Sequence, residues 1–460
     1  MVDLTLGSGW DATASPISNV SPEIICDFFR EAFKHSSTGT SMTLSHVSRT
    51  WRQIAIDDPF LWNSIHVTPQ GPSAFSKLCL ERSKQADLNV CYSDDVEYEL
   101  DEEEVAPFDP AMLHLHRCGE LKLIFADRSC AFVVLKSLKR EAVSRLVSFE
   151  VILEGNESFW THQDRPGDVF TGGAPLLTSL TLHGVSPLEC HVPLSNIIKL
   201  SLAGLGRYSE QYPDLHPSEF VAVLREVAST LKHLELDGSQ VFSTDKSPWS
   251  AVEMPVLVTL SIGDADEGDR EACEDYHSNF WKFVRMPALE DLSLFSLSSS
   301  QVGEVWRALI GQCGARVKSL SLVNVGLEEV DDALAKRFPN LHSLSLDDAM
   351  ILDVLTSLVS APGETVECPE LRYLTLEDCD EEKDAVIVQG FLRGRIASGH
   401  PIKTIVFRGG RQAYAPLRFA LKNVAEVIIE NGGNSRLSGR EDEKSELEGK
   451  GSDGGAVLAN

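Results

Sequence analysis

Two short stretches hold side chains of the kinds that bind metal ions. Residues 114–118, HLHRC, contain His114, His116 and Cys118, whose nitrogen and sulfur atoms are typical zinc ligands. A structural zinc site needs four ligands, and this cluster has no distant partner pair to complete it. Residues 264–269, DADEGD, place carboxylates near calcium-loop spacing but lack the glycine and the final glutamate of such a loop. We therefore expect both stretches to be loops, and we expect no metal or other cofactor.

Catalytic motifs are also missing from the sequence. It has no G-x-S-x-G segment for a serine nucleophile, no P-loop for a nucleotide and no H-E-x-x-H segment for a catalytic zinc. The sequence therefore predicts a protein that is not an enzyme and that acts by binding other proteins.

The charge balance limits the classes of partner. With 41 basic and 69 acidic residues the formal charge is −28, which repels phosphate backbones and anionic lipids. Neither nucleic acid nor a membrane surface is an expected partner, and neutral or basic protein segments fit better. The sequence shows no signal-peptide pattern and no apolar run near the roughly 20 residues of a spanning helix. Its ten cysteines include no C-x-x-C pair, so we expect reduced thiols and an intracellular protein, cytoplasmic or nuclear.

The N-terminal region concentrates apolar residues at helical spacing. In residues 21–33, SPEIICDFFREAF, Ser21 can cap a helix and Pro22 suits its first position. A second helix is expected over residues 44–55, ended by Asp57-Asp58-Pro59 and followed by a short apolar hook, Phe60-Leu61-Trp62. Its apolar face would consist of Leu44, Val47, Trp51, Ile54 and Ala55. About fifty residues cannot bury this much apolar surface among themselves, so the stripe either completes a larger core or docks a partner.

These residues resemble the F-box, in the F-box-like form frequent in fungal multi-domain proteins. The resemblance lies in SPEII…FF, LSHVSRTWRQIA and DPFLW, with Val20 and Ser48 replacing a leucine and a cysteine common in the family. It implies that the helices dock on the Skp adaptor of a cullin–RING ubiquitin ligase. The adaptor-contacting residues that it implies are Pro22, Ile25, Phe28, Val47 and Trp51. Some of these could equally be internal core, and the helices could instead form a small cap over the next domain.

Downstream, a short leucine pattern recurs. Nine segments fit L-x-x-L-x-L with Ile, Val or Phe allowed, and weaker copies occur at 145–151 and 423–429. The nine segments are 175–182, 196–202, 230–236, 255–262, 287–294, 316–322, 339–346, 369–376 and 401–407. The marker residues are 20 to 34 positions apart, a period typical of leucine-rich repeats with irregular insertions.

The repeats predict an α/β solenoid. The period of two in L-x-L points both leucines of a short strand into one core. Helical patterns lie between strands at 218–230, 327–338 and 350–360. Because no unit buries its apolar face alone, the units should stack, with parallel strands on the concave face and helices on the convex face. The short period disfavours the alternative, a leucine-rich βαβ sheet.

Polar residues between the leucines should line the concave sheet. We expect a mildly acidic groove that binds a neutral or basic target, with acidic side chains projecting from neighbouring strands a few ångströms apart. The candidate target-binding residues are Glu235, Asp237, Asp291, Asp347 and Glu377. Alternatively, these positions are simply the solvated face of the strands.

Five segments are expected along the chain. They are a disordered N-terminus (1–14), the F-box-like helical domain (15–67), a linker with degenerate early repeats (68–144), the repeat array (145–430) and a disordered tail (431–460). The linker should contain a helix and a strand within 75–92, an acidic loop at 94–104 and a degenerate repeat at 118–125. The resulting hypothesis is a substrate-recognition subunit of an SCF-type ubiquitin ligase with an unknown protein target. The alternative is a leucine-rich-repeat scaffold without a ligase role.

Overall fold

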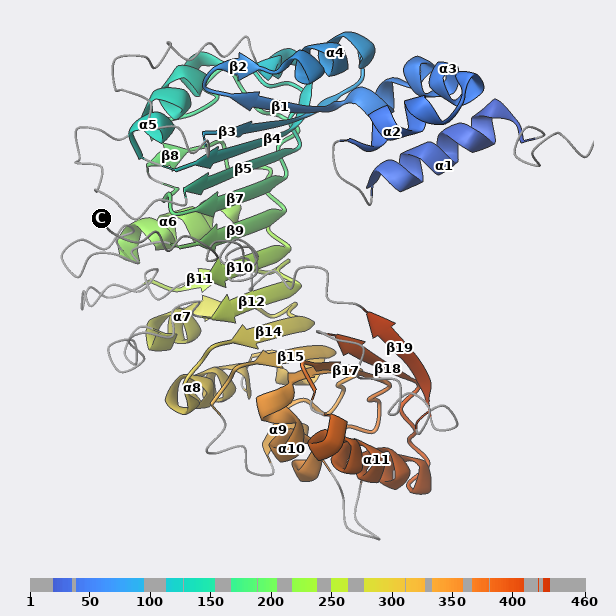
Figure 1. Cartoon of the computed structure of the whole chain (residues 1–460). Helices are drawn as coiled ribbons and strands as arrows, with labels where there is room; N and C mark the ends of the chain where they lie inside the picture. The colour runs from blue at the N-terminus through green and yellow to red at the C-terminus, as the bar shows by residue number, and fades with distance from the viewer. Residues whose placement is uncertain are drawn as a thin grey trace, which may run out of the picture. The chain divides into compact units, whose positions relative to one another are not determined.

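The structure is a computed structural model (Figure 1). It describes residues 20–34, 39–94, 113–126, 128–153, 167–187, 189–204, 217–237, 250–263, 277–310, 312–326, 333–358, 366–379, 381–408, 421 and 425–430. The expectations for both termini, for the acidic run after Asp94 and for the DADEGD stretch lie outside the described residues.

The chain is an α/β protein with a long, largely parallel sheet of fifteen strands that alternate with helices. The hydrogen-bonded order is β2-β1-β3-β4-β5-β7-β9-β10-β12-β14-β15-β16-β17-β18-β19. The β1–β2 pair is antiparallel, and the sheet's other pairs with a defined register are parallel. The chain divides into two compact units, Met1–Ile197 and Ile198–Asn460, which are described in turn.

The first unit begins with helices and continues as strands separated by helical turns. Its helical elements are α1 (Pro22–Lys34), α2 (Thr40–Val47), α3 (Arg49–Asp57), η2 (Pro59–Trp62), α4 (Ala74–Arg82), η4 (Leu115–Arg117), α5 (Arg128–Ser137) and η5 (Leu138–Arg140). Its strands are β1 (Ser64–Thr68), β2 (Gly71–Pro72), β3 (Leu88–Ser93), β4 (Cys118–Phe125), β5 (Ser148–Leu153), β6 (Gly167–Asp168), β7 (Ser179–His183) and β8 (Cys190–His191).

The prediction of a single helix over residues 44–55 is wrong, because the helix is interrupted at Ser48. Ser48 has extended backbone angles, φ −154° and ψ 171°, and separates α2 from α3. Its Oγ accepts a hydrogen bond from the N–H of Trp51 at 3.1 Å and caps α3. A serine hydroxyl offers the backbone an alternative to the helical ladder, which starts a new helix here.

The region after these helices follows the expected order. A helix and a strand, α4 and β3, occupy the segment 75–92, and residues 118–125 form β4 within the parallel sheet. The sheet begins earlier than expected, since β1 starts at Ser64 within the range assigned to the helical domain. The HLHRC stretch is not an open loop, because it includes η4 and the first residue of β4.

The second unit alternates strands with helices that gather on one side of them (Figure 1). Its strands are β9 (Lys199–Ala203), β10 (His233–Asp237), β11 (Val252–Glu253), β12 (Thr259–Gly263), β13 (Val284–Arg285), β14 (Asp291–Phe295), β15 (Ser319–Val323), β16 (Ser343–Asp347), β17 (Tyr373–Glu377), β18 (Thr404–Arg408) and β19 (Glu426–Glu430). Its helical elements are α6 (Pro217–Val227), α7 (His277–Phe283), α8 (Ser299–Ile310), η7 (Gly314–Arg316), α9 (Ala333–Arg337), α10 (Asp348–Ser357) and α11 (Glu381–Ala397).

The repeated leucines form an in-register ladder through this unit. Leu200, Leu234 and Leu260 are direct partners across β9, β10 and β12, and the ladder continues strand by strand to Val427 on β19. Leucines at the second and fourth strand positions are buried, while the intervening residues are mostly half-exposed. The predicted strand positions are therefore confirmed, and each leucine pair contributes to one continuous core.

Two buried arginines close turns in the sheet's connections. Arg117 donates hydrogen bonds to the carbonyl oxygens of Leu80 and Lys84 at 3.1 and 2.8 Å and to two further groups. In the second unit, Arg395 on α11 donates to the carbonyl oxygens of four residues, Glu367, Cys368, Leu371 and His400. Both guanidinium groups thus hold several backbone carbonyls of the adjoining turns, and those of Cys368 and Leu371 at Arg395 are buried.

Candidate interaction surfaces

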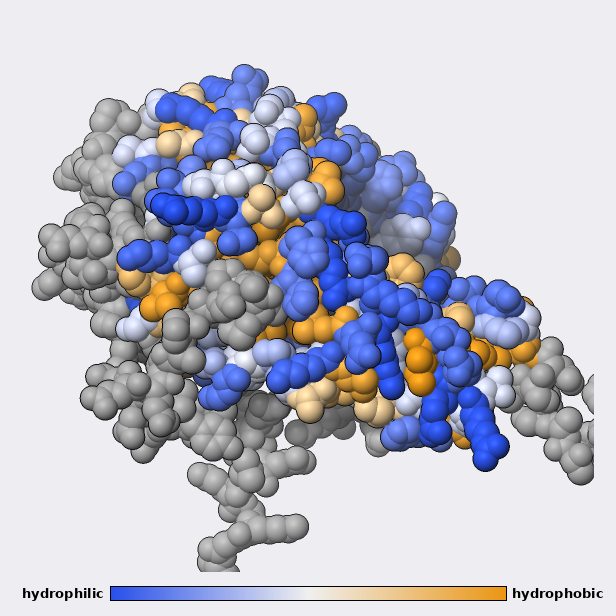
Figure 2. Space-filling view, turned by 90° about the horizontal axis from the view of Figure 1, so that it is seen from above, coloured by the Kyte–Doolittle hydropathy of each residue, from blue (hydrophilic) through white to orange (hydrophobic). Residues whose placement is uncertain are grey.

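Helix α1 carries apolar residues on two different faces. Ile25 and Phe29 are buried, 5% and 2% exposed, on the face that packs against α2 and α3. The Phe29 ring meets the ring of Trp51 edge-on, with centroids 4.9 Å apart. Ile24 and Phe28, also one turn apart, are 51% and 67% exposed. Figure 2 shows hydrophobic side chains among hydrophilic ones on the N-terminal helices, at the right of the view. This second face is apolar surface that the described part of the chain does not cover.

The residues implied by the F-box resemblance divide between surface and core. Pro22, Phe28 and Val47 are exposed, and Trp51 is half-buried. Ile25 is buried, in agreement with the alternative that some of these residues are internal core. It lies one turn before Phe29 and belongs to the contact between α1 and its neighbours. The structure brings Trp51 against α1, whereas Val47 points its side chain to solvent from the last residue of α2.

An ion pair fixes α1 to the turn that follows α3. Arg30 donates two hydrogen bonds to the carboxylate of the buried Asp58, at 2.8 and 3.1 Å. These hydrogen bonds raise the pKa of Arg30. Asp58 also accepts from the N–H of Phe60, and the Arg30 guanidinium lies 4.9 Å from the centroid of the Phe60 ring. The elements α1, α2, α3 and η2 together form a helical module. Phe60 remains 51% exposed and adds a further apolar side chain to the surface of this module.

A buried tryptophan ties the helices to the start of the sheet. The Nε1–H of Trp62 donates to the carbonyl oxygen of Ala55 at 2.6 Å. Its ring packs beside Phe75, with centroids 6.5 Å apart, and under the guanidinium of Arg82 at 4.3 Å. The helical module is therefore anchored through Trp62 and keeps its other faces available.

Most of the acidic residues expected in a target groove do not lie on neighbouring strands. Glu235 and Asp237 lie on β10, Asp291 on β14, Asp347 on β16 and Glu377 on β17. In hydrogen-bonded order β10 and β17 are five strand spacings apart, about 24 Å. Glu235 occupies the third strand position and Asp291 the first, so they also differ in height along the strands. The side chain of Asp237 lies outside the described residues.

Asp347 and Glu377 are the pair that the fold does bring together, as direct partners across β16 and β17. Their charges are not left isolated. Arg408 on β18 lies 3.6 Å from the Glu377 carboxylate, and Asp347 accepts a hydrogen bond from the N–H of Asn324. The expectation of one stacked acidic ladder is therefore wrong, and the acidic residues form separate spots.

Small hydroxyl residues occupy most of the face between those spots. Ser261, Ser293, Ser321, Ser345 and Thr375 are successive partners at the third position of five adjacent strands. Tyr373, two residues before Thr375 on β17, is 50% exposed. The described part of this face therefore consists mainly of small polar side chains, to which Tyr373 adds a large aromatic one.

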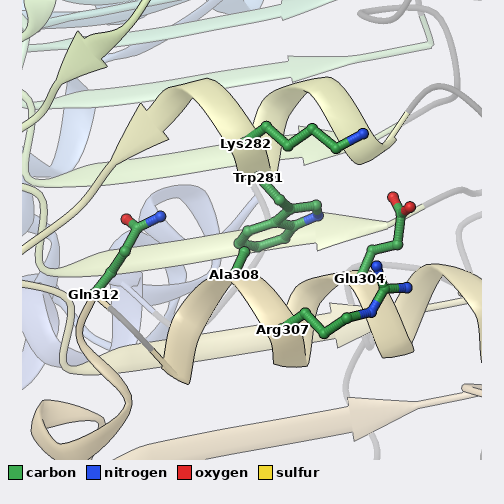
Figure 3. Close-up of a pocket in the computed structure, with 6 residues that line it drawn as sticks. All are labelled: Trp281, Lys282, Glu304, Arg307, Ala308 and Gln312. Atoms are coloured by element: carbon green, nitrogen blue, oxygen red, sulfur yellow. The ribbon is translucent and has the colours of Figure 1, made fainter.

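A hollow of about 280 Å³ lies between α7 and α8 (Figure 3). It is lined by Trp281, Lys282, Glu304, Arg307, Ala308 and Gln312. The indole Nε1 of the buried Trp281 and the Oε2 atom of Glu304 have no hydrogen-bond partner in the described part of the chain. The hollow therefore offers one hydrogen-bond donor and one acceptor to a small polar group. Its volume is below the usual range of ligand pockets, so it does not suit a larger ligand. No sequence pattern indicates this hollow.

The described residues hold no group of three or more His, Cys, Asp or Glu side chains placed to bind a metal ion. At the HLHRC stretch, the His114 and His116 rings lie 6.0 Å apart, whereas the thiol of Cys118 is buried and donates to the carbonyl of Glu120 at 3.0 Å. Burial raises the pKa of Cys118 to about 12, which opposes formation of the thiolate that zinc requires. Among the described helices, none is long and apolar enough to cross a membrane.

Comparison with known proteins adds no relative: no family model matches the chain, and no curated protein matches it significantly.

Proposed function

We propose that this chain is a substrate-recognition subunit of an SCF-type ubiquitin ligase. In this proposal α1, α2, α3 and η2 form an F-box-like module that binds the Skp adaptor, and the sheet with its helices is a leucine-rich-repeat solenoid that binds a protein target. The subunit has no chemistry of its own and acts inside the cell, in the cytoplasm or the nucleus. The adaptor and the target would both be proteins, without nucleic acid, membrane or cofactor.

The uncovered apolar surface of the helical module carries the proposal. Ile24, Phe28, Val47 and Phe60 are each at least half-exposed within one short module. Ile24 and Phe28 lie one turn apart on the same face of α1, and contiguous exposed apolar side chains are a common sign of a protein interface. Around them, the Arg30–Asp58 pair and the anchored Trp62 ring hold the backbone in place, which lowers the entropic cost of docking.

The in-register leucine ladder supports the second half of the proposal. A repeat period near that of leucine-rich repeats, a parallel strand in each unit and helices between strands are the features of that architecture. The target would lie on the polar strand face, which presents small hydroxyls and the separate acidic spots at Glu235, Asp291 and the Asp347–Glu377 pair. A neutral or basic segment suits such a face.

Co-purification of the full chain with the Skp adaptor tests the proposal. Phe28→Asp places a charge on the exposed apolar face without touching the core, and it should abolish co-purification. Val386→Asp is the matched control, since Val386 is an even more exposed apolar residue on α11, at 75%. The proposal fails if the adaptor does not bind the wild-type chain, or if both variants lose it equally.

The alternative is a leucine-rich-repeat scaffold whose N-terminal helices only cap the sheet. The contacts of Trp62 with Ala55, Phe75 and Arg82 favour it, because they join the helices to the first strands as a cap would be joined. The two functions differ in adaptor binding. If the Phe28→Asp variant binds every protein partner that the wild type binds, the scaffold function is the correct one.

A further inference from the structure

The sheet has two edges, and they are built differently. At one edge, β2 is an antiparallel strand of two residues that ends in Pro72, which has no N–H to donate. Short strands and proline are common ways of protecting an edge from further pairing. At the other edge, β19 is a five-residue strand, EVIIE, without proline. The described part of the chain contains no strand paired to its outer side.

The ladder to β18 determines which backbone groups of β19 face outward. The N–H of Glu426 donates to the carbonyl oxygen of Lys403 at 2.9 Å. In a parallel strand, successive residues direct their N–H and C=O groups to opposite sides, so Glu426 and Ile428 bond toward β18. Val427 and Ile429 therefore present their N–H and C=O groups to the outer edge. This edge offers two donors and two acceptors in the spacing of a β-ladder.

Within the described residues, the apolar core is also less well covered at this end. Val427 and Ile429 continue the leucine ladder as partners of Ile405 and Phe407. Ile405 and Phe407 are fully buried, whereas Val427 and Ile429 are only partly buried. Ile428, on the opposite face, is 39% exposed. The last unit of a stacked array normally needs a cover with a polar outer side, and a further strand would supply one.

We propose that the outer edge of β19 is a docking site for an extended segment of another protein, one with basic residues flanking an apolar stretch. Glu426 is exposed at the start of the strand, and the whole chain carries a formal charge of −28. A basic segment is drawn to this edge, and its own backbone completes the ladder.

A second copy of the chain is a poorer occupant on the same evidence. Antiparallel pairing about Ile428 sets Glu426 opposite Glu430 of the other copy, and parallel pairing sets each glutamate opposite itself. Like charges directly across a strand pair are destabilising. The site is independent of adaptor binding by the N-terminal helices, so either proposal can fail without the other.

Fluorescence polarisation of a labelled peptide, Lys-Val-Thr-Val-Thr-Val-Lys, titrated with the full chain tests the site. Saturable binding is expected, and the same peptide with glutamate at both ends should bind at least about tenfold more weakly. Ile429→Pro removes one outward N–H without removing a bond to β18, and it should weaken binding about tenfold. Ile429→Thr keeps that N–H and a β-branched side chain, so it is the matched control and should bind like the wild type.

Charge reversal gives a second measurement should Ile429→Pro fail to fold. Glu426→Lys should exchange the preference, so that the glutamate-ended peptide becomes the tighter ligand. No binding of the lysine-ended peptide at about 1 mM, equal binding by the proline and threonine variants, or an unchanged charge preference would each overturn the proposal. A concentration-dependent dimer that Ile429→Pro abolishes would overturn the choice of occupant.

Discussion

Phe28 and Ile25 are neighbours on α1, and substituting the first should affect binding while substituting the second should affect stability. Phe28 is 67% exposed and Ile25 is 95% buried. Complete burial of a Phe side chain contributes about 1.5–3 kcal/mol, so covering the two-thirds that is still exposed would contribute about 1–2 kcal/mol to docking. Phe28→Ala should therefore weaken adaptor binding about 5-fold to 30-fold. Ile25→Ala instead leaves a cavity under the helix, at a cost of about 2–4 kcal/mol in the stability of the module.

Two measurements on the full chain distinguish these effects. Calorimetric titration with the purified adaptor gives the change in affinity, and hydrogen exchange of the α1 amides gives the local stability. Phe28→Ala should keep wild-type exchange rates, whereas Ile25→Ala should speed exchange at least about thirtyfold, the equivalent of 2 kcal/mol. Wild-type affinity in Phe28→Ala would refute the assignment of this face to the adaptor. Unchanged exchange in Ile25→Ala would refute the packing of α1.

Three further predictions concern stability, each measured by thermal or urea unfolding of the full chain. Arg395→Met leaves buried carbonyls unpaired and should lower the free energy of unfolding by about 3–5 kcal/mol. Arg393→Met, on the exposed side of α11, should lower it by less than about 0.5 kcal/mol. Similar losses of stability in the two variants would contradict the hydrogen-bonded role of Arg395. Leu320→Asp buries an unpaired carboxylate in the ladder and should unfold the second unit, whereas Ser319→Asp on the polar face should not. Gly263→Ala should destabilise by more than about 1 kcal/mol because the added methyl would overlap the backbone carbonyl oxygen of Phe295, and a neutral outcome would show that β14 can move away.

The repeated strands could be predicted from the sequence because their evidence is local. Each L-x-L segment contains the period of two that a strand requires, and β7, β10 and β16 all lie where that pattern predicts. The break at Ser48 was not predicted, since the apolar spacing from Leu44 to Ala55 continues across it. Its cause is one side-chain hydrogen bond to the backbone, which periodicity does not show.

The candidate surfaces were harder to predict because they depend on register and tertiary packing. The leucine pattern places Glu235 between two strand leucines and Asp291 before the first of them, two repeats apart, so their separation could be inferred from the repeats; the partners of Asp347 and Glu377 could not. The helical pattern of α1 likewise makes Ile24 and Ile25 look equivalent, and only the packing of α1 against α2 and α3 decides which one is buried. The charges that pair with buried or acidic groups, Arg30 and Arg408, come from other elements and leave no local pattern.

The alternation that builds the core also determines where binding can change without loss of the fold. At each strand of the second unit, the second and fourth residues belong to the ladder, and their replacement disturbs both neighbouring strands because each is paired on two sides. The first and third residues are mostly half-exposed, so a sequence can vary at most of these positions at small cost in stability. A protein that must recognise a particular target needs residues that can vary on its binding face and residues that stay the same in its core. The helical module has the same property on a smaller scale, since α1 keeps Phe29 in the core while Phe28 remains at the surface. Stability and recognition are thus assigned to different side chains of the same elements, which is why single substitutions can test them separately.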